Sequence, residues 1–188
     1  MRNAVCAISS LILVFATLTA QAPPIEQVYV TRVFPHPGRL GLFVANADGS
    51  NERPLLTTPN LDYDATWSRD GSWIVFTSER NGSADVFRVH PDGSGLERLT
   101  DHIAYDDQAA FSADGRQLVF VSTRAAGTAD LWTMDIGSRN ARPLTSGPGG
   151  DFRPSWSPDG QWIAFSSDRG AGMPFSQGRY EGAPAAYM

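Results

Sequence analysis

The chain has 188 residues, of which 41% are hydrophobic and 11% aromatic, a composition typical of folded domains and not of disordered ones. All 15 basic residues are arginine, and with 20 acidic residues the formal net charge is −5. This acidic balance argues against a nucleic-acid partner, because proteins that bind phosphate backbones present a basic surface.

Residues 1–22 have the features of a secretory signal peptide. Arg2 precedes a mainly apolar run over residues 4–16, and Ala-Gln-Ala at 20–22 fits a cleavage site. We therefore expect a periplasmic or secreted protein with no stable membrane span after cleavage; the alternative is that the segment is retained as an anchor. Cys6, the only cysteine, lies in this segment, so the mature chain has no thiol for a disulfide or a metal site.

Residues 62–169 contain one sequence pattern nearly three times. Its marker residues recur at separations of 44 and 45: Ser68, Ser112 and Ser157; Arg80, Arg124 and Arg169; and Phe43, Phe87 and Trp132. A repeat of this length is typical of a four-stranded propeller blade.

A shorter repeat lies inside this pattern, since Asp-Gly pairs begin at residues 48, 70, 92 and 114, each 22 residues after the last. Each blade thus contains two hairpins, and Asp-Gly predicts type I′ turns. Residues 73–77 and 117–121 are rich in β-branched and aromatic side chains, as in strands covered on both faces.

Strands are expected at about 28–31, 42–44 and 54–57, then 63–68, 73–79, 84–90 and 95–100, four more between 107 and 145, and finally 152–157 and 162–167. Connections of about 2–6 residues leave no room for crossover helices, so the strands are antiparallel. The predicted fold class is all-β: an incomplete β-propeller of four-stranded antiparallel blades, with about three and a quarter blades.

The expected organisation is a signal peptide over 1–22, a partial propeller over 23–170 and an irregular tail over 171–188. The period predicts an aromatic residue near position 177, where the chain has Gln177. Closed propellers need about four to eight blades. Three alternatives follow: a truncated fragment, an open arc, or a ring completed by another chain.

Two sets of side chains recur once per blade and are candidates for a binding site. The aromatic set is Trp67, Phe111 and Trp156, and the acidic set is Asp62, Asp106 and Asp151. The aromatic set could stack on a ligand, but packing of blade on blade is favoured. The acidic set could bind a cation in a channel, but aspartates that accept backbone N–H bonds in turns are favoured.

A third recurring set, Arg80, Arg124 and Arg169, ends the second strand of each blade. We expect an ion pair across the following loop to Asp85 or Asp130, which open the third strand; partner binding is the alternative. Asn81-Gly82-Ser83 matches a glycosylation sequon, although a hairpin turn is favoured.

The sequence offers no recognisable catalytic group. It has no Gly-x-Ser-x-Gly elbow and no glycine-rich phosphate loop, and His36, His90 and His102 occupy unrelated positions. We therefore predict no catalytic, cofactor-binding or metal-binding residues, no cofactor, and a chain that is not an enzyme.

The segments WSRDG, FSADG and WSPDG, each followed by an apolar strand and an arginine, and the closing RLT and RPLT resemble the TolB-like β-propeller repeat family over about residues 28–170. The resemblance implies a non-enzymatic periplasmic or extracellular scaffold with a protein partner in the cell envelope. Its contact surface is expected in the loops at 34–39 and 101–107. The alternatives are the propeller portion of a hydrolase or polysaccharide lyase, and a non-functional fragment.

Overall fold

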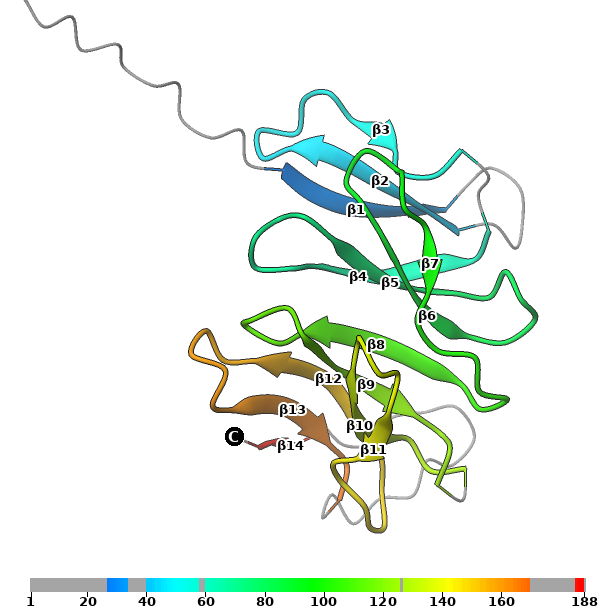
Figure 1. Cartoon of the computed structure of the whole chain (residues 1–188), viewed down its shortest axis with the longest axis vertical. Helices are drawn as coiled ribbons and strands as arrows, with labels where there is room; N and C mark the ends of the chain where they lie inside the picture. Colours follow the sequence, from blue (N-terminus) through cyan, green and yellow to red (C-terminus); the bar gives the residue numbers. More distant parts are fainter. Residues whose placement is uncertain (1–26, 34–39, 58–59, 126, 170–184, 188) are drawn as a thin grey trace, which may run out of the picture.

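The computed structural model describes residues 27–33, 40–57, 60–125, 127–169 and 185–187 (Figure 1). The predicted signal peptide, the loop at 34–39 and most of the predicted tail therefore lie outside the described residues. Within them there is no helix long and apolar enough to cross a membrane.

The described residues form fourteen strands in four antiparallel sheets. The strands are β1 (Gln27–Val33), β2 (Leu40–Asn46), β3 (Arg53–Pro54), β4 (Asp62–Trp67), β5 (Ile74–Ser78), β6 (Asp85–Val89), β7 (Glu97–Arg98), β8 (Asp106–Phe111), β9 (Gln117–Ser122), β10 (Asp130–Asp135), β11 (Ala141–Pro143), β12 (Asp151–Trp156), β13 (Ile163–Ser167) and β14 (Ala185–Tyr187).

Each sheet corresponds to one sequence repeat. The two complete sheets, β4 to β7 and β8 to β11, have four strands in sequence order, while β1 to β3 and β12 to β14 form three-stranded sheets. The sheets follow one another in chain order with their faces apposed (Figure 1). This confirms the all-β, incomplete propeller predicted from the repeat.

The chain end differs from the prediction. Residues 185–187, expected within an irregular tail, form β14 and pair antiparallel with β13. This segment is too short to show an alternating pattern in sequence, and it pairs because β13 presents a free edge with unpaired backbone groups.

The Asp-Gly turns also differ from the prediction of type I′. The glycines have φ between 70° and 87°, whereas the aspartates are not among the described non-glycine residues with positive φ. The Gly115 N–H donates to the Ser112 carbonyl at 2.9 Å, as in a type I turn followed by a left-handed glycine. Asp114 Oδ1 accepts from the Ser112 hydroxyl at 2.7 Å and the Arg116 N–H at 3.1 Å. These bonds hold the aspartate at negative φ, so only the next residue must be left-handed.

The first strands of the second, third and fourth sheets, β4, β8 and β12, contain a bulge that the sequence pattern did not indicate. The pairing of β4 with β5 shifts register between Tyr63 and Thr66, and equivalent shifts occur in β8 and β12. The bulged residues Asp64, Gln108 and Arg153 have φ of 50°, 52° and 54°. In a regular strand successive side chains point to opposite faces of the sheet, and each bulge interrupts this alternation at one polar residue.

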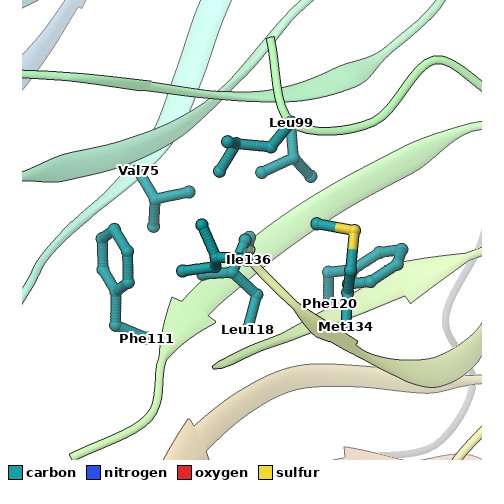
Figure 2. Close-up of a cluster of buried hydrophobic side chains, with 9 residues drawn as sticks. Val75, Leu99, Phe111, Leu118, Phe120, Met134 and Ile136 are labelled. Carbon is teal, nitrogen blue, oxygen red and sulfur yellow. The ribbon is translucent and has the colours of Figure 1, made fainter. Parts of the chain in front are cut away.

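The core lies between the sheets. Figure 2 shows Val75 and Leu99 of one blade against Phe111, Leu118 and Phe120 of the next, all of them buried in one cluster. Equivalent clusters lie on either side, at the preceding and following blade interfaces. Burial of apolar surface between neighbouring blades therefore fixes the relative position of the sheets.

Candidate functional site

One end of the blades carries most of the recurring polar residues. There β4, β8 and β12 begin and β5, β9 and β13 end, so that Asp62 lies opposite Ser78, Asp106 opposite Ser122, and Asp151 opposite Ser167. We call this end of the blades the acidic face. It also carries residues 101–105 of the connection between β7 and β8. The sequence analysis expected a contact loop over 101–107, but residues 106 and 107 are the first two residues of β8.

On the acidic face an arginine binds each aspartate that opens β4, β8 or β12. Arg80 Nη2 donates to Asp62 Oδ1 at 2.9 Å, and its Nε donates to Ser78 Oγ at 2.8 Å. Arg169 makes the same two contacts, to Asp151 and Ser167. These aspartate side chains are at most 2% exposed. Since the buried carboxylates are paired and hydrogen-bonded, they fix the strand ends in place.

The middle blade has a different hydrogen-bond arrangement. Arg124 Nη2 donates to Asp106 Oδ2 at 2.6 Å, but the Ser122 hydroxyl donates to Asp106 Oδ1, also at 2.6 Å. Arg124 Nε is buried and has no hydrogen-bond partner among the described residues. The guanidinium of this blade is therefore less completely satisfied than those of Arg80 and Arg169.

These contacts correct the predicted partners of the recurring charges. Arg80 and Arg124 bind Asp62 and Asp106, not Asp85 and Asp130, and Asp85 Oδ2 instead accepts from Arg98 Nη2 at 2.7 Å. The arginine and the first-strand aspartate meet because strand pairing places their backbones at the same end of the sheet. Within the described residues no group of three His, Cys, Asp or Glu side chains is placed to hold a metal ion.

A second cluster of polar residues lies along the bulged strands β4, β8 and β12. Burial raises the pKa of Asp107 to about 6; the Gln108 hydrogen bond opposes this shift, and the neighbouring Asp64 and Asp106 carboxylates add to it. Burial also raises the pKa of Asp64, while Arg153 opposes that shift. The Arg153 N–H donates to Gln108 Oε1 at 2.8 Å across the blade boundary. The bulged residues of neighbouring blades thus interact with one another.

The loop at 101–105 presents large apolar side chains to solvent. Ile103 is 91% exposed and Tyr105 is 60% exposed, although both the preceding Thr100 and the following Asp106 are buried. Thr100 Oγ1 accepts from the Val86 N–H at 3.0 Å, and the Asp106 N–H donates to the Ala84 carbonyl at 2.9 Å. A loop held at both ends with exposed apolar side chains between them is suited to contact with another molecule.

A pocket lies beside this loop, between the end of one blade and the outer part of the next. Its volume is about 410 Å³, and its lining comprises Arg98, Leu99, Thr100, Asp101, His102, Arg124, Met134 and Arg139. Sequence reasoning had selected only Arg124 and the loop residues 101 and 102 of this set. Arg98 and Arg139 are 41 residues apart in the chain, and packing of the two blades brings them together.

The recurring aromatic residues lie in the core clusters between blades: Phe111 is 8% exposed and belongs to the cluster of Figure 2, and Trp67 and Trp156 pack against the two neighbouring clusters. This confirms their predicted packing role. Of the histidines, His90 stacks on Trp73 with ring centroids 3.7 Å apart, and His102 lines the pocket. His36 lies outside the described residues.

Comparison with known proteins places this geometry in a family. The sequence profile of the TolB β-propeller domain matches residues 22–126 and 108–177. The chain belongs to the TolB β-propeller family. An uncharacterised protein of Agrobacterium fabrum is 35% identical over 135 residues, which cover 66% of this chain and 46% of that protein. The Tol-Pal system protein TolB of Anaeromyxobacter dehalogenans is 32% identical over 120 residues, which cover 63% of this chain and 27% of TolB.

Solved structures show the same TolB-like fold. TolB from Acinetobacter baumannii matches with a TM-score of 0.72 and 21% identity, over 86% of this chain and 38% of that one. Puromycin hydrolase matches with a TM-score of 0.61 and 20% identity, over 76% of this chain and 23% of the hydrolase. At sequence identities this low, the similarity shows a shared fold and does not show a shared function. The chain spans less than half the length of the curated relatives that it matches.

The Asp–Arg pairing that sequence reasoning missed did leave a signal. Asp62 and Arg80, Asp106 and Arg124, and Asp151 and Arg169 are each 18 residues apart. A constant separation of opposite charges across one hairpin indicates that the two residues face each other at its open end. No comparable signal marks the bulges or the pocket, since both depend on how neighbouring blades pack.

Proposed function

We propose that this TolB-family chain is a non-enzymatic scaffold that binds a protein partner in the periplasm or outside the cell. The observation that carries the proposal is the loop at 101–105, where Ile103 and Tyr105 are exposed between two anchored ends. Apolar side chains on a rigid support commonly form the core of a protein–protein interface. The signal-like residues 1–22 support export, with residues 23–170 as the exported partial propeller.

The relatives support the same proposal at a coarser level. One of them is a Tol-Pal system protein, and its sequence and the fold of a TolB structure resemble this chain. A cell-envelope partner is the simplest extension of that likeness.

The test places a photo-crosslinking amino acid at position 103 of the tagged chain and exposes it to cell-envelope extract of the source organism. We expect a discrete cross-linked band that unlabelled wild-type chain competes away. Unlabelled Ile103→Asp should compete about 5- to 30-fold more weakly, since the loss of one apolar anchor costs about 1–2 kcal/mol. Leu96→Asp is the matched control, since Leu96 is an exposed leucine, 42% accessible, outside the loop. Equal competition by wild type and Ile103→Asp would refute the proposal.

A hydrolase-associated propeller is the competing function, because puromycin hydrolase has a similar fold. The scaffold proposal predicts no turnover of chromogenic peptide or ester substrates by the purified chain. Turnover that copurifies with the chain through successive columns would favour the hydrolase instead.

A further inference from the structure

We propose that the pocket between the second and third blades binds the C-terminal carboxylate of a protein chain whose last residue is apolar. This inference deepens the proposed scaffold function and rests on it. The pocket of about 410 Å³ is large enough for one or two residues of a peptide. Its lining combines the two kinds of contact that such a ligand needs.

The first kind of contact is electrostatic. Arg98, Arg124 and Arg139 line the pocket, and Asp101 is the one acidic residue in the lining. The carboxylates that pair with Arg98 and Arg124 belong to Asp85 and Asp106, which are fully buried and are not part of the lining. A guanidinium has five N–H donors and a single carboxylate uses at most two, so donors remain for a ligand.

Two of the three arginines of this pocket each have a donor without an acceptor. Arg98 Nε and Arg124 Nε are both buried without a hydrogen-bond partner among the described residues. At the positions equivalent to Arg124 in the neighbouring blades, the Nε atoms of Arg80 and Arg169 donate to serine hydroxyls at 2.8 and 2.9 Å. Arg98 and Arg124 are each already paired with one buried carboxylate, so what they lack is a hydrogen-bond acceptor and not a compensating charge. A carboxylate in the pocket adds acceptor oxygens for these guanidinium groups.

The second kind of contact is apolar. Leu99 and Met134 line the same pocket and are 4% and 2% exposed. In the last residue of a protein chain, the α-carbon carries both the terminal carboxylate and the side chain. A C-terminal residue with an apolar side chain therefore presents both kinds of group at one point. An internal Asp or Glu side chain lacks that adjacent apolar group, so the pocket favours a chain terminus.

The adjoining loop extends the surface on which the rest of the ligand lies. Ile103 follows the pocket residues Asp101 and His102 directly and is 91% exposed. Residues upstream of the ligand's C-terminus would contact this side chain on leaving the pocket. The pocket and the exposed loop thus form one continuous docking site.

The experiment titrates the whole chain with three tripeptides, followed by isothermal calorimetry. They are acetyl-Ala-Gly-Leu with a free carboxylate, the same peptide as its C-terminal amide, and acetyl-Leu-Glu-Ala amide, whose carboxylate is internal. We expect the free-carboxylate peptide to bind with a Kd of roughly 0.1–1 mM, and each of the other two at least about tenfold more weakly.

Arg139→Gln is the informative variant, because Arg139 is 34% exposed and its partner Glu97 keeps Arg88. We expect it to weaken the free-carboxylate peptide by about tenfold, and Arg139→Lys to weaken it less, because the lysine keeps the charge but not the planar fork. Arg142→Gln, at an exposed arginine outside the pocket lining, is the charge-matched control and should bind as wild type.

Three results would each overturn the inference: no binding of the free-carboxylate peptide, equal binding of either other peptide, or unchanged binding by Arg139→Gln. The titration is independent of the cross-linking test at Ile103. A chain that cross-links its partner but ignores the peptides keeps the scaffold function and loses the pocket.

Discussion

At the scale of single residues, the chain repeatedly buries a carboxylate and satisfies it with an arginine 18 residues later. Asp106 is fully buried and accepts from both Ser122 and Arg124. Arg124 in turn lies over the rings of Phe120 and Trp132, 5.5 and 5.4 Å from their centroids. One side chain thus connects the strand end, the loop and the aromatic core.

Replacing Arg124 with Gln tests the energetic importance of this connection. The change leaves Asp106 buried without its cation, and we expect it to lower the free energy of unfolding by about 3–5 kcal/mol. Arg142→Gln at an exposed position should change it by less than about 0.5 kcal/mol. Urea unfolding followed by tryptophan fluorescence measures both, and equal stability of the two variants would contradict the assignment.

Asp107 gives a prediction in pH. Burial raises its pKa from 3.8 to about 6 in the folded state, so the folded chain holds a proton that the unfolded chain releases. The stabilisation from this proton is complete below pH 4 and is lost as the pH rises through 6, by an amount on the order of 3 kcal/mol. Asp107→Asn removes the dependence, so the difference in unfolding free energy between the two proteins should change over this pH window. A constant difference would show that the Asp107 carboxyl is not buried in this way.

At the scale of elements, the Asp-Gly hairpins set the length of each blade. Gly93 and Gly115 occupy the same place in successive turns, with φ of 87° and 70°. A Cβ on Gly115 meets no atom within 4 Å, whereas one on Gly93 would lie 2.6 Å from the Leu55 carbonyl oxygen of the preceding blade. A substitution at Gly115 therefore tests only the strain of positive φ, whereas one at Gly93 tests that strain together with a steric clash between two blades.

Alanine at these two positions measures each contribution. Gly115→Ala should lower the free energy of unfolding by about 1 kcal/mol, because alanine is strained at positive φ. Gly93→Ala carries the same strain and also forces the two blades apart, so we expect an additional cost of about 1–3 kcal/mol. Chemical denaturation of both variants is the measurement. Equal losses would mean that the first and second blades can shift apart without cost.

At the scale of the whole molecule, stability comes from the interfaces between neighbouring sheets. The cluster of Figure 2 contains residues of two blades, and Leu118 in it is fully buried. Trp162, by contrast, is 68% exposed on the fourth blade. In a stack of repeats each interface contributes separately, so burial and not size determines what a side chain contributes.

Leu118→Ala therefore should cost about 2–5 kcal/mol of unfolding free energy, as expected for a cavity in a packed core. Trp162→Ala removes a larger side chain, yet we expect a loss of less than about 1 kcal/mol because its surface is already largely in water. Thermal melts of the two variants rank them directly. A larger loss for Trp162→Ala would show that another molecule or segment covers it.

The sequence by itself determined the repeat, the strand positions to within a few residues and the antiparallel blades, because each of these follows from local turn chemistry and from apolar runs recurring at a fixed period. It also marked residues 101–107 as a varied loop, although residues 106 and 107 begin β8. Even the Asp–Arg pairs were present in it as the constant separation of 18 residues.

Only the tertiary structure decided which charged residues form ion pairs, where β4, β8 and β12 bulge and where a pocket forms. Asp64, Gln108 and Arg153 are left-handed where the pairing of β4, β8 and β12 shifts register. Arg139 donates to the Arg98 carbonyl across a blade boundary. Such contacts join residues about forty positions apart, and their geometry is set by the packing of whole sheets. A repeat pattern specifies the sheets, but the contacts between them depend on side-chain volumes and angles that no local pattern contains.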